Sequence, residues 1–187
     1  RCYIIHPCFH NIHNIHTVKL AEEKKLDSLG LSHNHIGTSG ARLLVSQLLC
    51  DSNTYLQSSL CGLFLSENNL KDEGAIEIAR LYTSGVFPSL VKIGLNSNNI
   101  TDIGVCALAE AIDARIYPNS KLEVLGLSAN NAITSVGTTA FASVLRNNSK
   151  MLRLFFNNCN LIGNNGAIPL IHAASKHPTL LRLGLSD

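Results

Sequence analysis

Histidines and cysteines near the start of the chain are the residues best suited to metal chemistry. Imidazole and thiolate groups bind zinc, and three of the histidines have the spacing of one helical face. Pro7 interrupts that helix, and the spacing matches no zinc module, so we predict no metal site. The residues concerned are Cys2, His6, Cys8, His10, His13 and His16.

The sequence offers no recognisable catalytic apparatus. No serine or cysteine has an identifiable base and orienting acid, and no glycine-rich loop could cradle a phosphate. We therefore expect a protein that is not an enzyme and that takes no cofactor and no small-molecule substrate.

The composition of the chain argues against nucleic acid and membranes as partners. The chain has 187 residues, 45% of them hydrophobic and 15% charged, with a formal net charge of +2. A charge so small recruits neither nucleic acid nor an anionic membrane, and no apolar run is long enough to span a bilayer. The six cysteines form no CxxC pair, which favours reduced thiols and a cytoplasmic setting. Because the chain begins at Arg1, we expect a fragment of a larger protein.

A repeat of about 31 residues organises the chain. The pattern L-x-x-L-x-L-x-x-N-x-L, in which the last position also accepts Ile, predicts a short strand followed by a turn. In the second half of each repeat, a glycine and a stripe of apolar residues with helical period predict an amphipathic helix. Copies begin at Leu26, Leu60, Leu90 and Leu122, a degenerate fifth begins at Leu152, and a sixth starts at Leu180 and stops at Asp187.

Two recurring polar positions have structural explanations. Residues two places before each glycine can cap a helix by accepting from a free backbone N–H, namely Thr38, Asp72, Asp102, Ser135 and Asn164. The asparagine that ends each strand pattern can satisfy backbone groups where the chain turns. That predicted ladder comprises Asn34, Asn68, Asn98, Asn130 and Asn160.

The consensus and its period resemble leucine-rich repeats of the ribonuclease-inhibitor-like subtype. That subtype also forms the C-terminal arrays of Nod-like receptors and the body of Ran GTPase-activating proteins. The resemblance implies an α/β solenoid, a horseshoe with parallel strands on the concave face and helices on the convex face. Residues 26–187 would form this domain, as five repeats plus a truncated sixth. Residues 1–25 would be a divergent leading segment or partial cap.

Function is expected on the concave face. Alternate strand residues point there, and the central column reads Gly30, Phe64, Gly94, Gly126, Phe156 and Gly184. We predict that Phe64 and Phe156 contact a partner, with Lys92, Arg182 and the strand-exit residue His33 as weaker candidates. The alternative for the fifth repeat is a shifted register, with Phe156 buried in place of Phe155.

These features predict a non-catalytic scaffold that binds another protein through its concave face. An alternative is a GTPase-activating protein resembling the Ran GTPase activators, but the strand-exit loops lack an arginine and no acidic tail follows. Inhibition of a secreted ribonuclease would need an acidic concave face, and the predicted one contains no acid.

Overall fold

A computed structural model describes residues 2–4, 26–50 and 54–186. From Ser28 onward strands and helices alternate, with one additional short helix just before the strand that begins at Gly62. The strands are β1 (Cys2–Ile4), β2 (Ser28–Gly30), β3 (Gly62–Phe64), β4 (Lys92–Gly94), β5 (Val124–Gly126), β6 (Arg153–Phe155) and β7 (Arg182–Gly184). The helices are α1 (Gly37–Leu48), α2 (Thr54–Ser59), α3 (Lys71–Thr83), α4 (Asp102–Ala111), α5 (Ser135–Leu145) and α6 (Gly163–Ser175).

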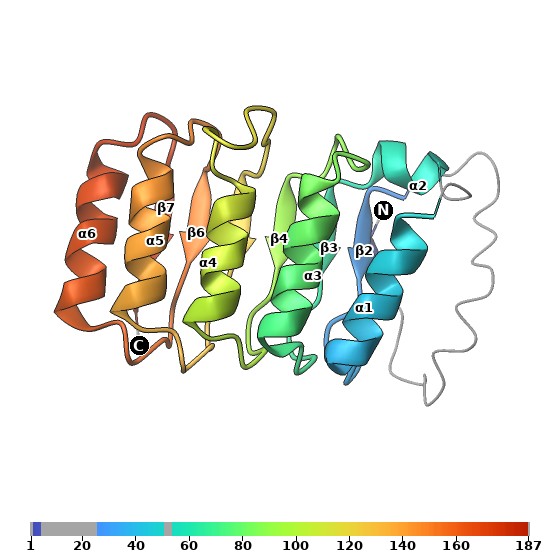
Figure 1. Cartoon of the computed structure of the whole chain (residues 1–187), viewed down its shortest axis with the longest axis horizontal. Coiled ribbons are helices and arrows are strands. Elements are labelled where there is room, and N and C mark those ends of the chain that lie inside the picture. Colours follow the sequence, from blue (N-terminus) through green and yellow to red (C-terminus); the bar gives the residue numbers. More distant parts are fainter. Residues whose placement is uncertain (1, 5–25, 51–53, 187) are drawn as a thin grey trace.

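The strands form one parallel sheet in sequence order, from β1 to β7. Helices α1, α3, α4, α5 and α6 stand side by side on one side of that sheet (Figure 1). Neighbouring helices need about 8–10 Å, whereas neighbouring strands need about 4.8 Å, so the stack bends with the sheet on its inner side. The expected α/β solenoid is confirmed.

The core lies between the sheet and the helix layer. The strand leucines point into it, and Leu63, Leu125 and Leu154 are wholly buried. Helix residues such as Ile78 and Phe141 close it from the other side. Each repeat therefore buries its apolar face largely against its neighbours, which is why the repeats are stable only as a stack.

The asparagine ladder joins each repeat to the one before it. Asn98 is fully buried; its amide oxygen accepts from the backbone N–H groups of Asn68 (2.9 Å) and Leu70 (3.3 Å). Its amide nitrogen donates to the carbonyl of Leu65 at 2.9 Å. Asn68 and Asn130 make equivalent bonds, and the amide nitrogen of Asn34 donates to carbonyls of its own turn. These four residues have the expected structural role.

Asn160, the fifth predicted ladder residue, is not part of the ladder. Its side chain is exposed, and Cys159 occupies the buried ladder position instead. The Cys159 thiol donates to the carbonyl of Leu127 at 3.5 Å. Burial raises the pKa of this thiol, which keeps the proton needed for that bond in place. The fifth repeat thus retains the ladder contact with a weaker donor.

The predicted caps Asp72 and Asp102 were assigned to the wrong helices. Each lies within the first turn of its own helix and caps the helix of the next repeat. Asp72 accepts from the backbone N–H of Thr101 (2.8 Å) and of Gly104 (3.0 Å), and from the Thr101 hydroxyl. Asp102 makes the same three bonds to Thr134 and Gly137. Sequence spacing could not separate a cap within a repeat from one between repeats.

The other three predicted caps are also wrong. The Thr38 hydroxyl donates to the carbonyl of Leu70, Ser135 is the first residue of α5, and Asn164 lies inside α6, which has no side-chain cap. Threonines one position earlier cap two helices, Thr101 by accepting from Ile103 and Thr134 by accepting from Val136.

The helix glycines are required by this close approach between repeats. A Cβ on Gly104 would lie 2.8 Å from an Asp72 carboxylate oxygen, and one on Gly137 would lie 2.6 Å from the Asp102 oxygen. A side chain at either place would displace the carboxylate from its cap.

A second set of polar residues accepts hydrogen bonds from backbone N–H groups in the loops that follow the C-terminal ends of α5 and α6. The Asn148 side-chain oxygen accepts from the backbone N–H groups of Lys150 and Met151. His177, one repeat later, uses its Nδ1 in the same way to accept from Thr179 (3.3 Å) and Leu180 (3.0 Å). This position is chemically variable, so the sequence pattern did not disclose it.

The leading segment contributes to the sheet. β1 pairs with β2 in parallel, with Cys2 opposite Ser28 and Ile4 opposite Gly30. Residues 5–25, which carry His6, His10, His13, His16 and Cys8, lie outside the described residues.

Candidate protein-interaction surface

No helix covers the inner face of the sheet among the described residues, and three columns of side chains run across it. The columns hold the first and third residues of each strand and the second residue after it, because alternate positions face the same side. Serine and asparagine dominate the column formed by the second residue after each strand, whereas glycine dominates the central column, formed by the third residue of each strand. The surface therefore combines exposed backbone with a few large side chains.

Phe64 is one of those large side chains, and neighbouring glycines hold it in place. A Cβ on Gly62 would lie 2.9 Å from its ring, and one on Gly94 of the next strand would lie 3.0 Å from it. The ring therefore rests against strand backbone, partly exposed, with its orientation fixed. A fixed aromatic ring loses little entropy when a partner covers it.

Phe156 is not on this surface. It is 1% exposed and packs edge-to-face against Phe141 of α5, with ring centroids 5.6 Å apart. The strand register explains the correction, because Arg153 pairs with Val124 and Phe155 pairs with Gly126. The fifth repeat thus begins at Met151, one residue before the predicted start, which is the shifted register with Phe156 buried in place of Phe155.

Phe155 takes the surface position in place of Phe156. Its ring lies beside the backbone of Gly184, where an added Cβ would approach it to 2.9 Å. The buried Met151 was the signal for the correct register, since Met151, Leu154, Phe156 and Cys159 match the apolar pattern once methionine and cysteine are admitted.

The charges on the inner columns are all positive among the described residues. Lys92 of β4, Arg153 of β6 and Arg182 of β7 occupy the same column and are exposed. The guanidinium of Arg182 lies 5.7 Å from the centroid of the Phe155 ring, within the range of a cation–π contact. Arg153 was missed by the sequence analysis because of the register error; Lys92 and Arg182 lie where they were predicted.

His33 lies at the rim, where the chain leaves β2. Its Nδ1 is 2.9 Å from a carboxylate oxygen of Glu67, the equivalent residue of the next repeat, and both side chains are at least half exposed. Both residues have positive φ, near 60°. The sequence placed His33 correctly at the strand exit but did not reveal its acidic neighbour.

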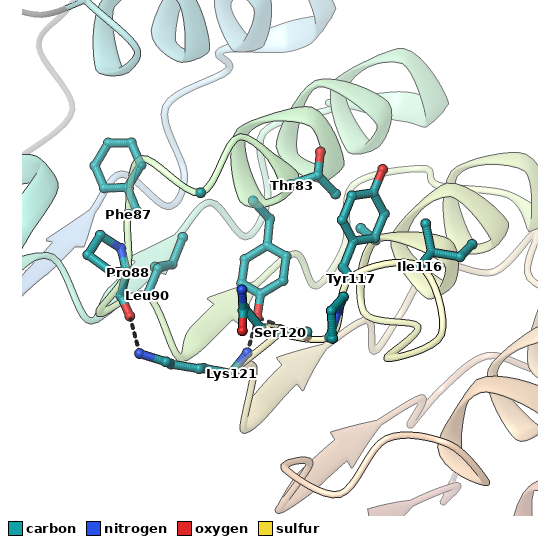
Figure 2. Close-up of a pocket in the computed structure, with 13 residues that line it drawn as sticks. Thr83, Phe87, Pro88, Leu90, Ile116, Tyr117, Ser120 and Lys121 are labelled. Atoms are coloured by element: carbon teal, nitrogen blue, oxygen red, sulfur yellow. Dashed lines mark hydrogen bonds between the residues drawn. The ribbon is translucent and has the colours of Figure 1, made fainter.

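A hollow of about 470 Å³ lies away from this face, between the loops that follow α3 and α4. Figure 2 shows Lys121 reaching across it to the carbonyl of Pro88 at 3.4 Å. The Tyr82 hydroxyl accepts from the backbone N–H of Lys121 and bonds Ser120. These hydrogen bonds connect the two loops, so we interpret the hollow as a structural junction between repeats.

No group of three His, Cys, Asp or Glu side chains within the described part of the chain could hold a metal ion. Among the same residues, none of the helices has the length and apolarity needed to cross a bilayer.

Comparison with known proteins agrees with this architecture. A family model described as "Leucine Rich repeat" matches residues 24–45, 63–79 and 88–109. Those matches fall on successive strand–helix units of the solenoid. The chain is a leucine-rich repeat protein.

Relatives of the leucine-rich repeat chain place it in the ribonuclease-inhibitor-like subtype. It is 32% identical over 181 residues to "NACHT, LRR and PYD domains-containing protein 3" of Homo sapiens and 30% identical over 178 residues to that of Rattus norvegicus. Each alignment covers 95% of this chain and 16% of the relative. "Ribonuclease inhibitor" of Mus musculus is 30% identical over 169 residues, which cover 90% of this chain and 34% of the relative.

Proposed function

We propose that this leucine-rich repeat chain is a non-catalytic scaffold that binds another protein through the inner face of its sheet. The observation that carries the proposal is the pair of partly exposed aromatic rings, Phe64 and Phe155, each set against a glycine of a neighbouring strand. Aromatic side chains are frequent binding hot spots, and rigid ones bind at a lower entropic cost.

The cationic residues of the same face indicate the charge of the partner's surface. Lys92, Arg153 and Arg182 lie in one column, and the three inner columns hold no acidic side chain among the described residues. An acidic partner surface would complement them, and His33 with Glu67 would form the rim of the contact.

The same proposal assigns the parts of the chain. Residues 26–187 act as the repeat domain, and residues 1–25 lead into it, with β1 extending the sheet. A cytoplasmic setting fits the Cys159 thiol, since its role in the ladder requires the reduced, protonated form. The chain carries out this role within a larger leucine-rich repeat protein.

The test is affinity capture followed by direct binding. Proteins retained by the parent chain are identified by mass spectrometry, and the affinity of each purified candidate is measured for a Phe64→Ser/Phe155→Ser variant. We expect the variant to bind at least tenfold more weakly, because each lost ring removes an anchor.

The matched control is Ile103→Ser/Val136→Ser, which removes two exposed apolar side chains from the helical side. It should bind like the parent. If the control loses binding and the aromatic variant keeps it, the functional surface is on the helices and the proposal is wrong.

A further inference from the structure

Arg153 and Arg182 lie directly opposite each other on neighbouring strands. The register pairs them across β6 and β7, at the edge of the inner face. Both side chains are exposed, and neither forms an ion pair with an acid of the described chain. Like charges directly opposite each other destabilise a sheet, so this pair is unfavourable until an anion lies between the two groups.

Arg182 is also held in position for such an anion. The Phe155 ring supports the Arg182 guanidinium, and Gly184 leaves room for that ring beside the strand. A guanidinium held by an aromatic ring keeps its donors free for a planar acceptor. Carboxylates match this geometry with two parallel hydrogen bonds.

The two arginines belong to a longer row of side chains, with one residue from each strand. The strand register places Val124 opposite Arg153 and Lys92 opposite Val124, so this row consists of Lys92, Val124, Arg153 and Arg182. Neighbouring strands are about 4.8 Å apart, so Lys92 lies about 12 Å from the midpoint of the two arginines. A partly exposed valine separates the two cationic positions.

We propose that this row binds an extended acidic segment of a partner protein, with the pattern acid-x-apolar-x-acid. This inference rests on the proposed function and specifies the partner's chemistry. An extended chain rises about 3.3 Å per residue and repeats its side-chain direction every second residue, so residues four apart share a face and lie about 13 Å apart. One acid meets Lys92, the apolar residue covers Val124, and the second acid meets the arginine pair.

The probe is a fluorescein-labelled nine-residue peptide with glutamates at positions 3 and 7, leucine at position 5, and serine and alanine elsewhere. Fluorescence anisotropy with the full chain measures its affinity. We expect it to bind at least tenfold more tightly than the same peptide with glutamines, and more weakly as salt is added. An isomer with glutamates at positions 3 and 6 directs them to opposite faces and should bind like the glutamine peptide.

Two variants assign the binding to this row. Arg153→Gln/Arg182→Gln should weaken binding of the glutamate peptide at least tenfold. Arg146→Gln/Lys150→Gln removes two exposed cations elsewhere on the surface and should change binding less than twofold. The first variant should unfold at the same temperature as the parent or a higher one, since it removes a repulsion.

Equal binding of the glutamate and glutamine peptides would overturn the inference, whatever the variants do. Preference for a peptide with phosphoserines at positions 3 and 7, with no binding of the glutamate peptide, would overturn the assignment to carboxylates. If a captured protein depends on Phe64 and Phe155 but not on the two arginines, the scaffold function stands and this inference fails.

Discussion

The carboxylate of Asp72 in α3 binds the hydroxyl of Thr101 at 2.8 Å, and through its other oxygen binds the backbone of the first turn of α4. Asp102 repeats the arrangement one helix later. Helices α4 and α5 are thus each capped by an aspartate of the preceding helix, so these two contacts between repeats also stabilise helix N-termini.

Replacing either aspartate by alanine should destabilise the chain. Asp72→Ala and Asp102→Ala each leave helix N–H groups without their acceptor, and we expect each to lower the free energy of unfolding by about 1–2 kcal/mol. Urea denaturation followed by circular dichroism measures this. Glu73→Ala, an exposed acid of the same first turn, is the control and should change stability by no more than about 0.5 kcal/mol. Equal effects at Asp72 and Glu73 would refute the capping role.

The two asparagines Asn98 and Asn160 should respond very differently to alanine. Asn98→Ala removes the acceptor for two buried N–H groups and the donor for a buried carbonyl, so it should cost about 3 kcal/mol. Asn160→Ala alters an exposed side chain and should stay within about 0.5 kcal/mol. Chemical denaturation of both variants would contradict the ladder assignment if Asn160 proved the more sensitive.

The register of the fifth repeat can be tested with its two phenylalanines. Phe156→Ala opens a cavity beside Phe141 and should cost about 3–5 kcal/mol. Phe155→Ala removes a partly exposed ring from the sheet surface and should cost about 1 kcal/mol. The thermal unfolding temperature should fall much further for the first variant; the reverse order would restore the register expected from the sequence.

His177 gives the chain a stability that depends on pH. Burial lowers the pKa of His177 below its usual 6.5, and the neutral ring uses Nδ1 as an acceptor for two backbone N–H groups. The unfolded chain therefore binds the proton more tightly, so this contribution is present above pH 6.5 and is lost as the pH falls from 6.5 towards the lower folded pKa.

His177→Asn isolates this effect, because Asn148 fills the equivalent position one repeat earlier with the same two bonds. The variant keeps an acceptor and does not titrate. Denaturation between pH 7.5 and pH 5 should show a smaller loss of stability in the variant than in the parent. Parallel curves for the two proteins would show that His177 is not the group responsible.

The recurrence of leucine and asparagine was enough to predict the solenoid, the strand–helix unit and four ladder residues. The inner face was harder, because a shift of one residue exchanges buried and exposed side chains. Leu152 fits the consensus leucine position in the sequence, whereas Met151 occupies the buried position. Because of this error, Arg153 and Phe155 were not predicted on the inner face. Contacts between repeats, such as that of Asp72 with Thr101, depend on how neighbouring helices sit and have no local signature.

The polar bonds of a repeat point in opposite directions along the stack. Asn98 holds the turn of the repeat before it, whereas Asp102 holds the helix of the repeat after it. If one whole internal repeat were deleted or duplicated, each of these side chains would meet an equivalent partner in its new neighbour. Duplication or deletion of a repeat within the gene can therefore lengthen or shorten the arc in units of one repeat, and the length of the inner face becomes a trait on which selection can act.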